Sequence, residues 1–258
     1  LKITPWLAAA VALVPLLQAC GGGGGSGGDG AVRLVNASSA YGALDLYSSD
    51  TLLSSAIAPE SGGSYVTLAS GTYTLKVKRN GSSTTVNSTD RSVAASTSHT
   101  LLAYSTADTL RSVFLTDNET APTSGAAKLR VFNASTEAGA LDVYVTASSA
   151  TLADSSPTVS ALATERFSSY NEISTGSYRV RVTGSGDKTD LRLDIDGISL
   201  ADQRITTLVL TTTPGGVLVN SLFVDQKSTV AAVANPSARI RLVAGAAANG
   251  VAAATING

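Results

Sequence analysis

Alternating apolar and polar positions recur along the chain in short stretches. Examples are Val32 to Asn36, Tyr73 to Arg79 and Thr206 to Thr212, which are rich in Val, Leu, Thr or Tyr. A period of two residues is typical of a β-strand with one buried face. Such stretches are bounded by Gly, Ser, Asn or Pro at spacings of roughly 8–12 residues, and no amphipathic stretch of helical length lies between them. The pattern predicts an all-β fold of antiparallel sandwiches.

Two segments carry more local predictions. Thr51 to Ala58 is compatible with a short helical turn. Leu191 to Leu200 contains Asp196-Gly197, a dipeptide that favours tight primed turns, so we expect a β-hairpin that turns there.

An internal repeat sets the domain organisation. VRLVNASSAYGALDLY at 32–47 recurs as LRVFNASTEAGALDVY at 129–144, displaced by 97 positions from Arg33 to Arg130. A repeat of this length is close to the common size of a self-sufficient domain. We therefore expect two tandem domains, at 31–122 and 126–228.

The repeat continues with one insertion and one incomplete copy. Gly71 to Val77 matches Gly176 to Val182 at a displacement of 105, so eight residues are added in the second copy, and we place them in Ala147 to Thr164. Arg239 to Ala253 resembles the repeat start, which predicts a truncated third repeat at 237–258. Either it belongs to a longer array, or it pairs with an edge of the second domain.

The N-terminal segment indicates export and lipid attachment. The apolar run Trp6 to Leu17 is too short for a membrane span of about 20 residues and suits an export signal. It ends in Leu17-Gln18-Ala19-Cys20-Gly21, which resembles the lipobox of bacterial lipoproteins. The resemblance implies a signal peptide at 1–19 and a lipid on Cys20, with the membrane as partner.

The residues after Cys20 complete this expectation. Gly-rich residues up to Gly30 form a flexible linker at 20–30. By analogy with lipoprotein sorting, Gly21 favours the outer membrane, on its periplasmic face or at the cell surface.

The repeated opening resembles a known family. Arg-x-x-Asn-Ala-Ser followed by Gly-Ala-Leu-Asp-(Leu/Val)-Tyr is similar to the start of the domain-of-unknown-function family 4397, in which His and Pro are common where Asn36 or Asn133, and Ser39 or Thr136, stand here. The resemblance covers about 31–228 in two copies. It implies an immunoglobulin-like β-sandwich in exported, often lipid-anchored proteins and brings no established catalytic activity.

Composition argues against several classes of function. With 18 basic and 19 acidic residues and a net charge of -1, the chain lacks the basic face that nucleic-acid binding needs. His99 is the only histidine, and its counterpart in the second repeat is Thr206, so multi-His zinc sites are excluded and a catalytic triad has little support. We expect no enzyme activity and no cofactor.

The polar residues shared by the two openings allow two interpretations. They form either a small Arg-Asp-Tyr site in each domain, or a structural ion pair between strands with a half-buried tyrosine. The second is favoured, and it predicts that each Arg faces the Asp of its own repeat. The Asn-Ala-Ser triplets are expected to close Asx turns. The residues concerned are Arg33, Asp45, Tyr47, Arg130, Asp142 and Tyr144.

Ligand sites have weaker candidates. A cluster of four carboxylates could hold calcium, but the spacing of a calcium loop is absent, so no metal is expected. Glycan stacking would fall to tyrosines such as Tyr41, Tyr65 or Tyr170, because the only tryptophan lies in the signal segment. The carboxylates are Asp187, Asp190, Asp194 and Asp196.

Two functions follow from these observations. The leading hypothesis is a non-enzymatic cell-envelope lipoprotein whose tandem sandwiches act as a scaffold, spacer or adhesion module for envelope or surface proteins. The alternative is an accessory lipoprotein that binds a glycan, a peptide or calcium.

Overall fold

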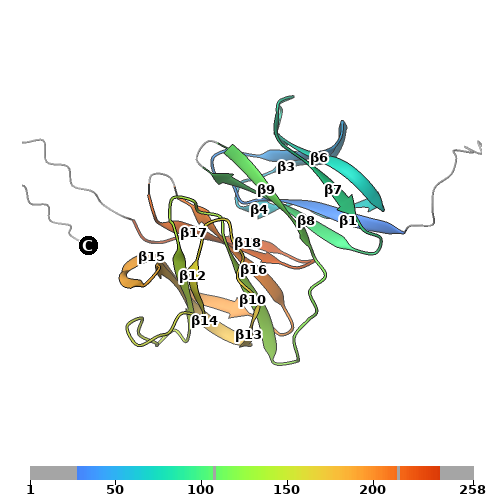
Figure 1. Cartoon of the computed structure of the whole chain (residues 1–258). Helices are drawn as coiled ribbons and strands as arrows, with labels where there is room; N and C mark the ends of the chain where they lie inside the picture. Colours follow the sequence, from blue (N-terminus) through green and yellow to red (C-terminus); the bar gives the residue numbers. More distant parts are fainter. Residues whose placement is uncertain (1–27, 107–108, 214–215, 239–258) are drawn as a thin grey trace, which may run out of the picture.

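The computed structural model describes residues 28–106, 109–213 and 216–238, and every regular element in these ranges is a β-strand. Figure 1 shows two bodies side by side, one built from β1 to β9 and the other from β10 to β18. The predicted signal segment, Cys20 and the third repeat beyond Ser237 and Ala238 lie outside the described residues.

The first body is a sandwich of two sheets. One sheet has the order β4-β1-β8-β9, with β5 paired to the other half of β1, and the second has the order β3-β2-β6-β7. The strands are β1 (Asp29–Asn36), β2 (Leu44–Ser48), β3 (Thr51–Ile57), β4 (Ser61–Gly62), β5 (Val66–Ala69), β6 (Gly71–Arg79), β7 (Thr85–Val93), β8 (Ser98–Thr106) and β9 (Thr109–Thr116).

The second body repeats this plan. Its sheets have the orders β13-β10-β16-β17-β18 and β12-β11-β14-β15. The strands are β10 (Ala126–Asn133), β11 (Leu141–Thr146), β12 (Val159–Leu162), β13 (Asn171–Ser174), β14 (Gly176–Gly184), β15 (Asp187–Leu200), β16 (Ile205–Thr212), β17 (Val219–Asp225) and β18 (Val230–Val233).

The predicted all-β sandwich fold is confirmed, with one difference in strand direction. Most neighbouring strands are antiparallel, but β1 pairs with β8, and β10 with β16, in parallel. The parallel pair occurs at the same place in both bodies, so the internal repeat extends from sequence to topology.

Each sandwich has its own core between its two sheets. In β1 the buried residues Val32 and Leu34 face Leu44, Leu46 and the other residues of the first core, while the residues between them point to the outer face. The second core is formed in the same way, by residues such as Leu129, Val131, Leu141, Val143, Leu208 and Leu210.

Four local features can be compared with the sequence expectations. The helical turn predicted in Thr51 to Ala58 is wrong, because Thr51–Ile57 is strand β3. The hairpin at Asp196-Gly197 is also wrong: β15 runs through it, and Gly197 with φ of 72° lies at a bulge where the pairing with β14 shifts register. The insertion is found where expected, in the connection from β11 to β12. In addition, β18 pairs with β17 beyond the predicted end at 228.

The two sandwiches are joined through their outer faces, in a seam that forms a third apolar cluster. The sheet with β1 and β8 contributes Val35, Ala37, Leu102, Val113 and Leu115, and the sheet with β10 and β16 contributes Phe132, Ala134, Val209, Leu222 and Val224. These two sets occupy equivalent repeat positions. An interface that uses the same patch on both partners is isologous and closes on itself.

Polar contacts across the seam are reciprocal as well. Glu165 accepts hydrogen bonds of 2.5 and 2.6 Å from Arg111 and one of 2.9 Å from the Tyr104 hydroxyl. At the equivalent positions with the sandwiches exchanged, Glu60 accepts a hydrogen bond of 3.2 Å from Asn220. Glu60 and Glu165 share a left-handed backbone, with φ of 55° and 58°. An approximate two-fold axis through the seam thus relates the two sandwiches.

The contacts in the seam shift the pKa values of two side chains, Tyr104 and Glu165. Burial, followed by the hydrogen bond to Glu165, raises the pKa of Tyr104 to about 12. The Arg111 hydrogen bonds lower the pKa of Glu165 below its ordinary value of 4.5.

Candidate functional site

Arg33 is a seam residue and does not pair with Asp45. Its side chain, only 2% exposed, donates from Nε to Thr100 Oγ1 at 2.9 Å. Its Nη atoms donate to the main-chain carbonyls of Ser228 at 2.6 Å and Asp225 at 2.8 Å, in the second sandwich. The predicted ion pair with Asp45 is therefore wrong, because Arg33 points to the outer face of one sheet and Asp45 belongs to the other sheet.

Arg130 occupies the equivalent position with fewer polar partners. It donates from Nε to Thr207 Oγ1 at 2.9 Å, and its guanidinium carbon lies 4.9 Å from the Phe167 ring centre and 4.6 Å from that of Tyr170. The predicted pair of Arg130 with Asp142 is also wrong, for the same geometric reason.

Asp45 and Asp142 hold the backbone of the neighbouring strand. Asp45 accepts hydrogen bonds from the Ala56 amide at 2.8 Å and from Asn80 Nδ2 at 3.0 Å. Asp142 accepts from the amides of Ala161 at 2.6 Å and Gly186 at 2.9 Å. Ala56 and Ala161 are both left-handed, with φ of 55° and 48°, so each carboxylate stabilises an irregular edge strand.

The Asn-Ala-Ser triplets form the predicted Asx turns. Asn36 Oδ1 accepts from the Ser38 amide at 3.1 Å, while its Nδ2 donates to the carbonyls of Gly42 and Ile57 at 2.8 and 3.0 Å. Asn133 repeats all three bonds, at 2.9 to 3.2 Å. Both side chains are buried, so this repeated feature is part of the fold.

The tyrosines considered for glycan stacking already have cations against a ring face. Arg79 lies over Tyr41, Arg33 over Tyr65 and Arg130 over Tyr170. Of the repeated pair, half-buried Tyr47 carries Lys78 over its ring at 4.3 Å, whereas Tyr144 is buried.

The four carboxylates near the β14–β15 turn have separate partners. Asp187 accepts from Thr189, Asp190 and Asp194 form ion pairs of 2.6 Å with Arg192 and Arg179 respectively, and Asp196 accepts from Ser148. Within the described ranges, no group of three His, Cys, Asp or Glu side chains could hold a metal ion.

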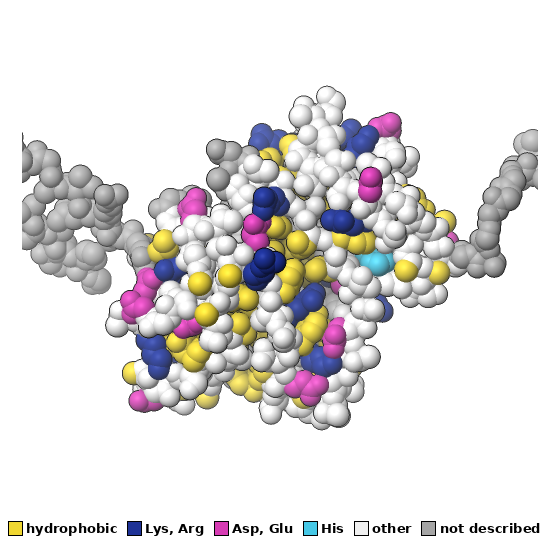
Figure 2. All heavy atoms as spheres, viewed as in Figure 1, with side chains coloured by type: hydrophobic (Ala, Val, Ile, Leu, Met, Phe, Trp, Pro, Cys, Tyr) yellow, Lys and Arg dark blue, Asp and Glu magenta, His cyan; other side chains and the backbone are white. Residues whose placement is uncertain are grey.

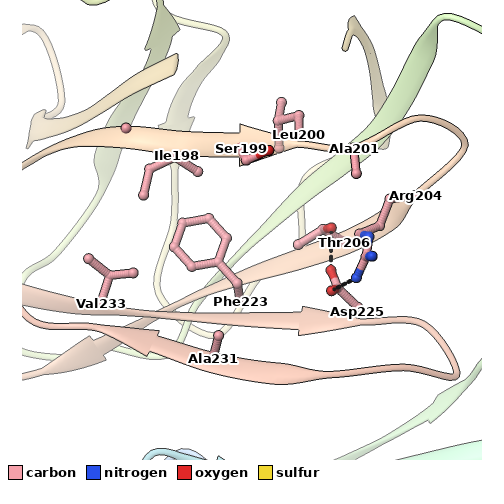
Figure 3. Close-up of a pocket in the computed structure, with 11 residues that line it drawn as sticks. Ile198, Ser199, Leu200, Ala201, Arg204, Thr206, Phe223, Asp225, Ala231 and Val233 are labelled. Atoms are coloured by element: carbon pink, nitrogen blue, oxygen red, sulfur yellow. Dashed lines mark hydrogen bonds and ion pairs between the residues drawn. The ribbon is translucent and has the colours of Figure 1, made fainter. Parts of the chain in front are cut away.

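A groove in the second sandwich is the strongest candidate for a ligand site. It has a volume of about 370 Å³ and lies between the end of β15 and strands β16 to β18. Figure 3 shows the Phe223 ring in its centre and a polar group formed by Thr206, Arg204 and Asp225 at one end. The apolar remainder of the lining is Ile198, Leu200, Ala201, Ala231 and Val233.

The polar end of the groove is held together by hydrogen bonds. Asp225 accepts from Thr206 Oγ1 at 2.6 Å, from Arg204 Nη1 at 2.5 Å and from Thr229 Oγ1 at 2.9 Å. A carboxylate held by three donors and neutralised by a guanidinium is a fixed polar anchor beside an apolar surface.

In the first sandwich, a histidine stacks on the ring equivalent to Phe223. There, His99 stacks on Phe114 with ring centres 4.8 Å apart and planes inclined by 12°. Burial is the main cause that lowers the pKa of His99, and its Nε2 accepts a hydrogen bond from the Ala94 amide. Phe223 and Thr206 occupy the repeat positions of Phe114 and His99. The shorter threonine has no ring to stack on Phe223, which packs partly against the core and lines the groove. The sequence shows that Thr206 stands where the first repeat has His99. It does not show that Phe223 lies next to this position, which is what makes the exchange matter for the groove.

Comparison with known proteins finds a family model that matches part of the chain. Residues 30–144 match the family model described as "Domain of unknown function (DUF4397)". No curated protein matches the chain. Among solved structures, the family CBM26 module CBMbc of Eubacterium rectale Amy13K, crystallised with maltoheptaose, is similar at 11% identity and a TM-score of 0.24, over 78% of this chain and 97% of that chain. The family match confirms the resemblance seen in the repeated opening: residues 30–144, which span the first repeat and the opening of the second, are similar to the DUF4397 family.

Proposed function

We propose that the protein is a non-enzymatic lipoprotein of the cell envelope in which the two sandwiches act as one rigid scaffold. The observation that carries the scaffold role is the closed seam. Apolar residues, the Arg33 hydrogen bonds and the Glu165 contacts all cross it. A pair joined in this way keeps a fixed shape, whereas sandwiches joined by a linker alone would move independently.

The proposed location at the outer membrane is based on the sequence around Cys20. Lipid on this cysteine would hold the protein at the outer membrane, facing the periplasm or the cell surface. The predicted linker at 20–30 is shortened by β1, which begins at Asp29. The eight residues from Gly21 to Gly28 would act as a tether with a root-mean-square reach of about 14–17 Å. The part of the chain that the structure describes has no helix suited to crossing a bilayer.

The surface offers contacts for envelope or surface proteins. On the face shown in Figure 2, Lys and Arg side chains are interspersed with Asp and Glu side chains over both sandwiches. A mixed surface of this kind fits specific polar contacts with proteins.

Fractionation of cells tests the lipoprotein proposal. Wild-type protein is expected in the membrane fraction and labelled by radioactive palmitate, whereas Cys20→Ala should be unlabelled and soluble. Ser26→Ala, in the same Gly-rich segment, serves as a matched control and should behave as wild type. A wild-type protein that stays unlabelled, or a Cys20→Ala variant that stays in the membrane, would contradict the proposal.

A further inference from the structure

We propose that the groove of the second sandwich is a saccharide-binding site in which a sugar ring stacks on Phe223 and its hydroxyls bind Arg204 and Asp225. The groove has apolar side chains on both of its sides, with Phe223 between them, and an Arg–Asp pair at one end (Figure 3). Its volume of about 370 Å³ is within the range of small-molecule sites, which is about 300–1,000 Å³.

The equivalent position in the first sandwich shows which kind of group can stack on this phenylalanine. Its Phe114 is covered by the flat, nearly parallel imidazole of His99. Thr206 replaces this histidine on the same strand position, and its side chain turns to Asp225. Among the described residues, Phe223 therefore has no stacked ring of the kind that His99 gives Phe114, and it lines the groove instead.

The polar end of the groove identifies the type of ring. Arg204 donates one hydrogen bond to Asp225 and its side chain is 40% exposed, so within the described chain it keeps further N–H groups for ligand oxygens. Asp225 and the Thr206 hydroxyl also lie at this end of the lining. These groups can exchange hydrogen bonds with several hydroxyls at the edge of a bound ring.

A sugar satisfies this arrangement better than the phenyl ring of a peptide. A phenyl ring would cover the Arg204–Asp225 pair without replacing the water that it displaces, and such unpaired polar groups are costly. A pyranose ring has an apolar face for Phe223 and hydroxyls at its edge for the charged pair. A free anion is disfavoured because the Asp225 carboxylate lies beside the guanidinium.

Sugar binding is independent of the proposed lipid anchor. Loss of binding would leave the fractionation of Cys20→Ala unchanged, and failure of the anchor would leave the groove unchanged.

Saturation-transfer NMR on the full chain tests the site, with glucose, galactose, N-acetylglucosamine and their oligosaccharides as probes. We expect transfer to the ring protons of at least one probe. Thr206→His should weaken it by about tenfold or more, because the imidazole would cover Phe223 as His99 covers Phe114. Thr189→His, which puts the same side chain at an exposed position of β15, should bind as wild type.

A second variant guards against misfolding of the first. Phe223→Leu removes the aromatic platform and keeps an apolar side chain, and its thermal unfolding is measured beside its binding. Loss of transfer in both groove variants, with their unfolding transitions retained, supports the site. Absence of transfer for every sugar, or equal transfer in wild type and both groove variants, overturns it. A short phenylalanine-containing peptide is run as a further probe, and transfer to this peptide with none to any sugar would assign the groove to peptides instead.

Discussion

The guanidinium of Arg33 donates a hydrogen bond of 2.8 Å to the carbonyl of Asp225, a residue 192 positions further along the chain. This contact joins the first strand of the first sandwich to the end of β17 in the second. Because the surrounding apolar patches are equivalent in the two repeats, the sandwiches close on each other. The proposed scaffold is therefore a compact pair, in contrast to an open array of spacers.

The two repeated arginines should differ in their effect on stability. Arg33→Ala leaves two carbonyls across the seam without their donor and removes the cation from Tyr65, which should lower the free energy of unfolding by about 2–4 kcal/mol. Arg130→Ala loses one side-chain hydrogen bond and aromatic contacts at a half-buried position, and should cost about 1 kcal/mol. Urea unfolding measures both. Equal losses would show that Arg33 does not have the role assigned to it in the seam.

The Glu165 contact predicts a dependence of stability on acid. Since folding lowers the pKa of Glu165 below 4.5, its contribution is present above about pH 4.5 and is lost as the pH falls through the folded-state value. Glu165→Gln should therefore be less stable than wild type at neutral pH, and the difference should narrow on acidification. Urea midpoints between about pH 7 and pH 3 measure this.

Glu137→Gln, at an exposed position of the same sandwich, is the matched control and should keep a nearly constant difference from wild type over this range. If the gap between wild type and Glu165→Gln stays the same at all pH values, the ionised Glu165 does not stabilise the seam.

The sandwich fold and the repeat could be predicted from the sequence, but the partners of the repeated arginines could not. The period of two assigns a residue to one face of a strand, and it correctly separates Arg33 from Val32 and Leu34. It does not say which sheet lies opposite that face. Asp45 was expected to face Arg33 because both recur, yet each recurs for a separate reason: Arg33 belongs to the seam pattern, and Asp45 holds the Ala56 bulge.

The sequence contains a pattern that indicates the seam. Val35 and Phe132 are apolar residues on the face that also carries the arginines, where a solvent-facing strand would have polar side chains. Such positions predict a second packed layer without naming its partner. The groove also depends on a contact between strands. Thr206 and Phe223 lie on neighbouring strands, and the sequence alone does not show that they line the same groove.

An engineered disulfide across the seam tests the closed pairing most directly. A Cβ built at Gly62 in β4 lies 3.1 Å from the Cβ of Val230 in β18. A disulfide spans about 3.5–4.5 Å between Cβ atoms, so the two strands need to separate by only a few tenths of an ångström to accept one. The chain has one other cysteine, so Gly62→Cys and Val230→Cys are combined with Cys20→Ala. Under mild oxidation, we predict an intramolecular disulfide, seen by mass spectrometry as the loss of two hydrogens and by the absence of free thiols. Two free thiols in a folded monomer would contradict the pairing of the sandwiches.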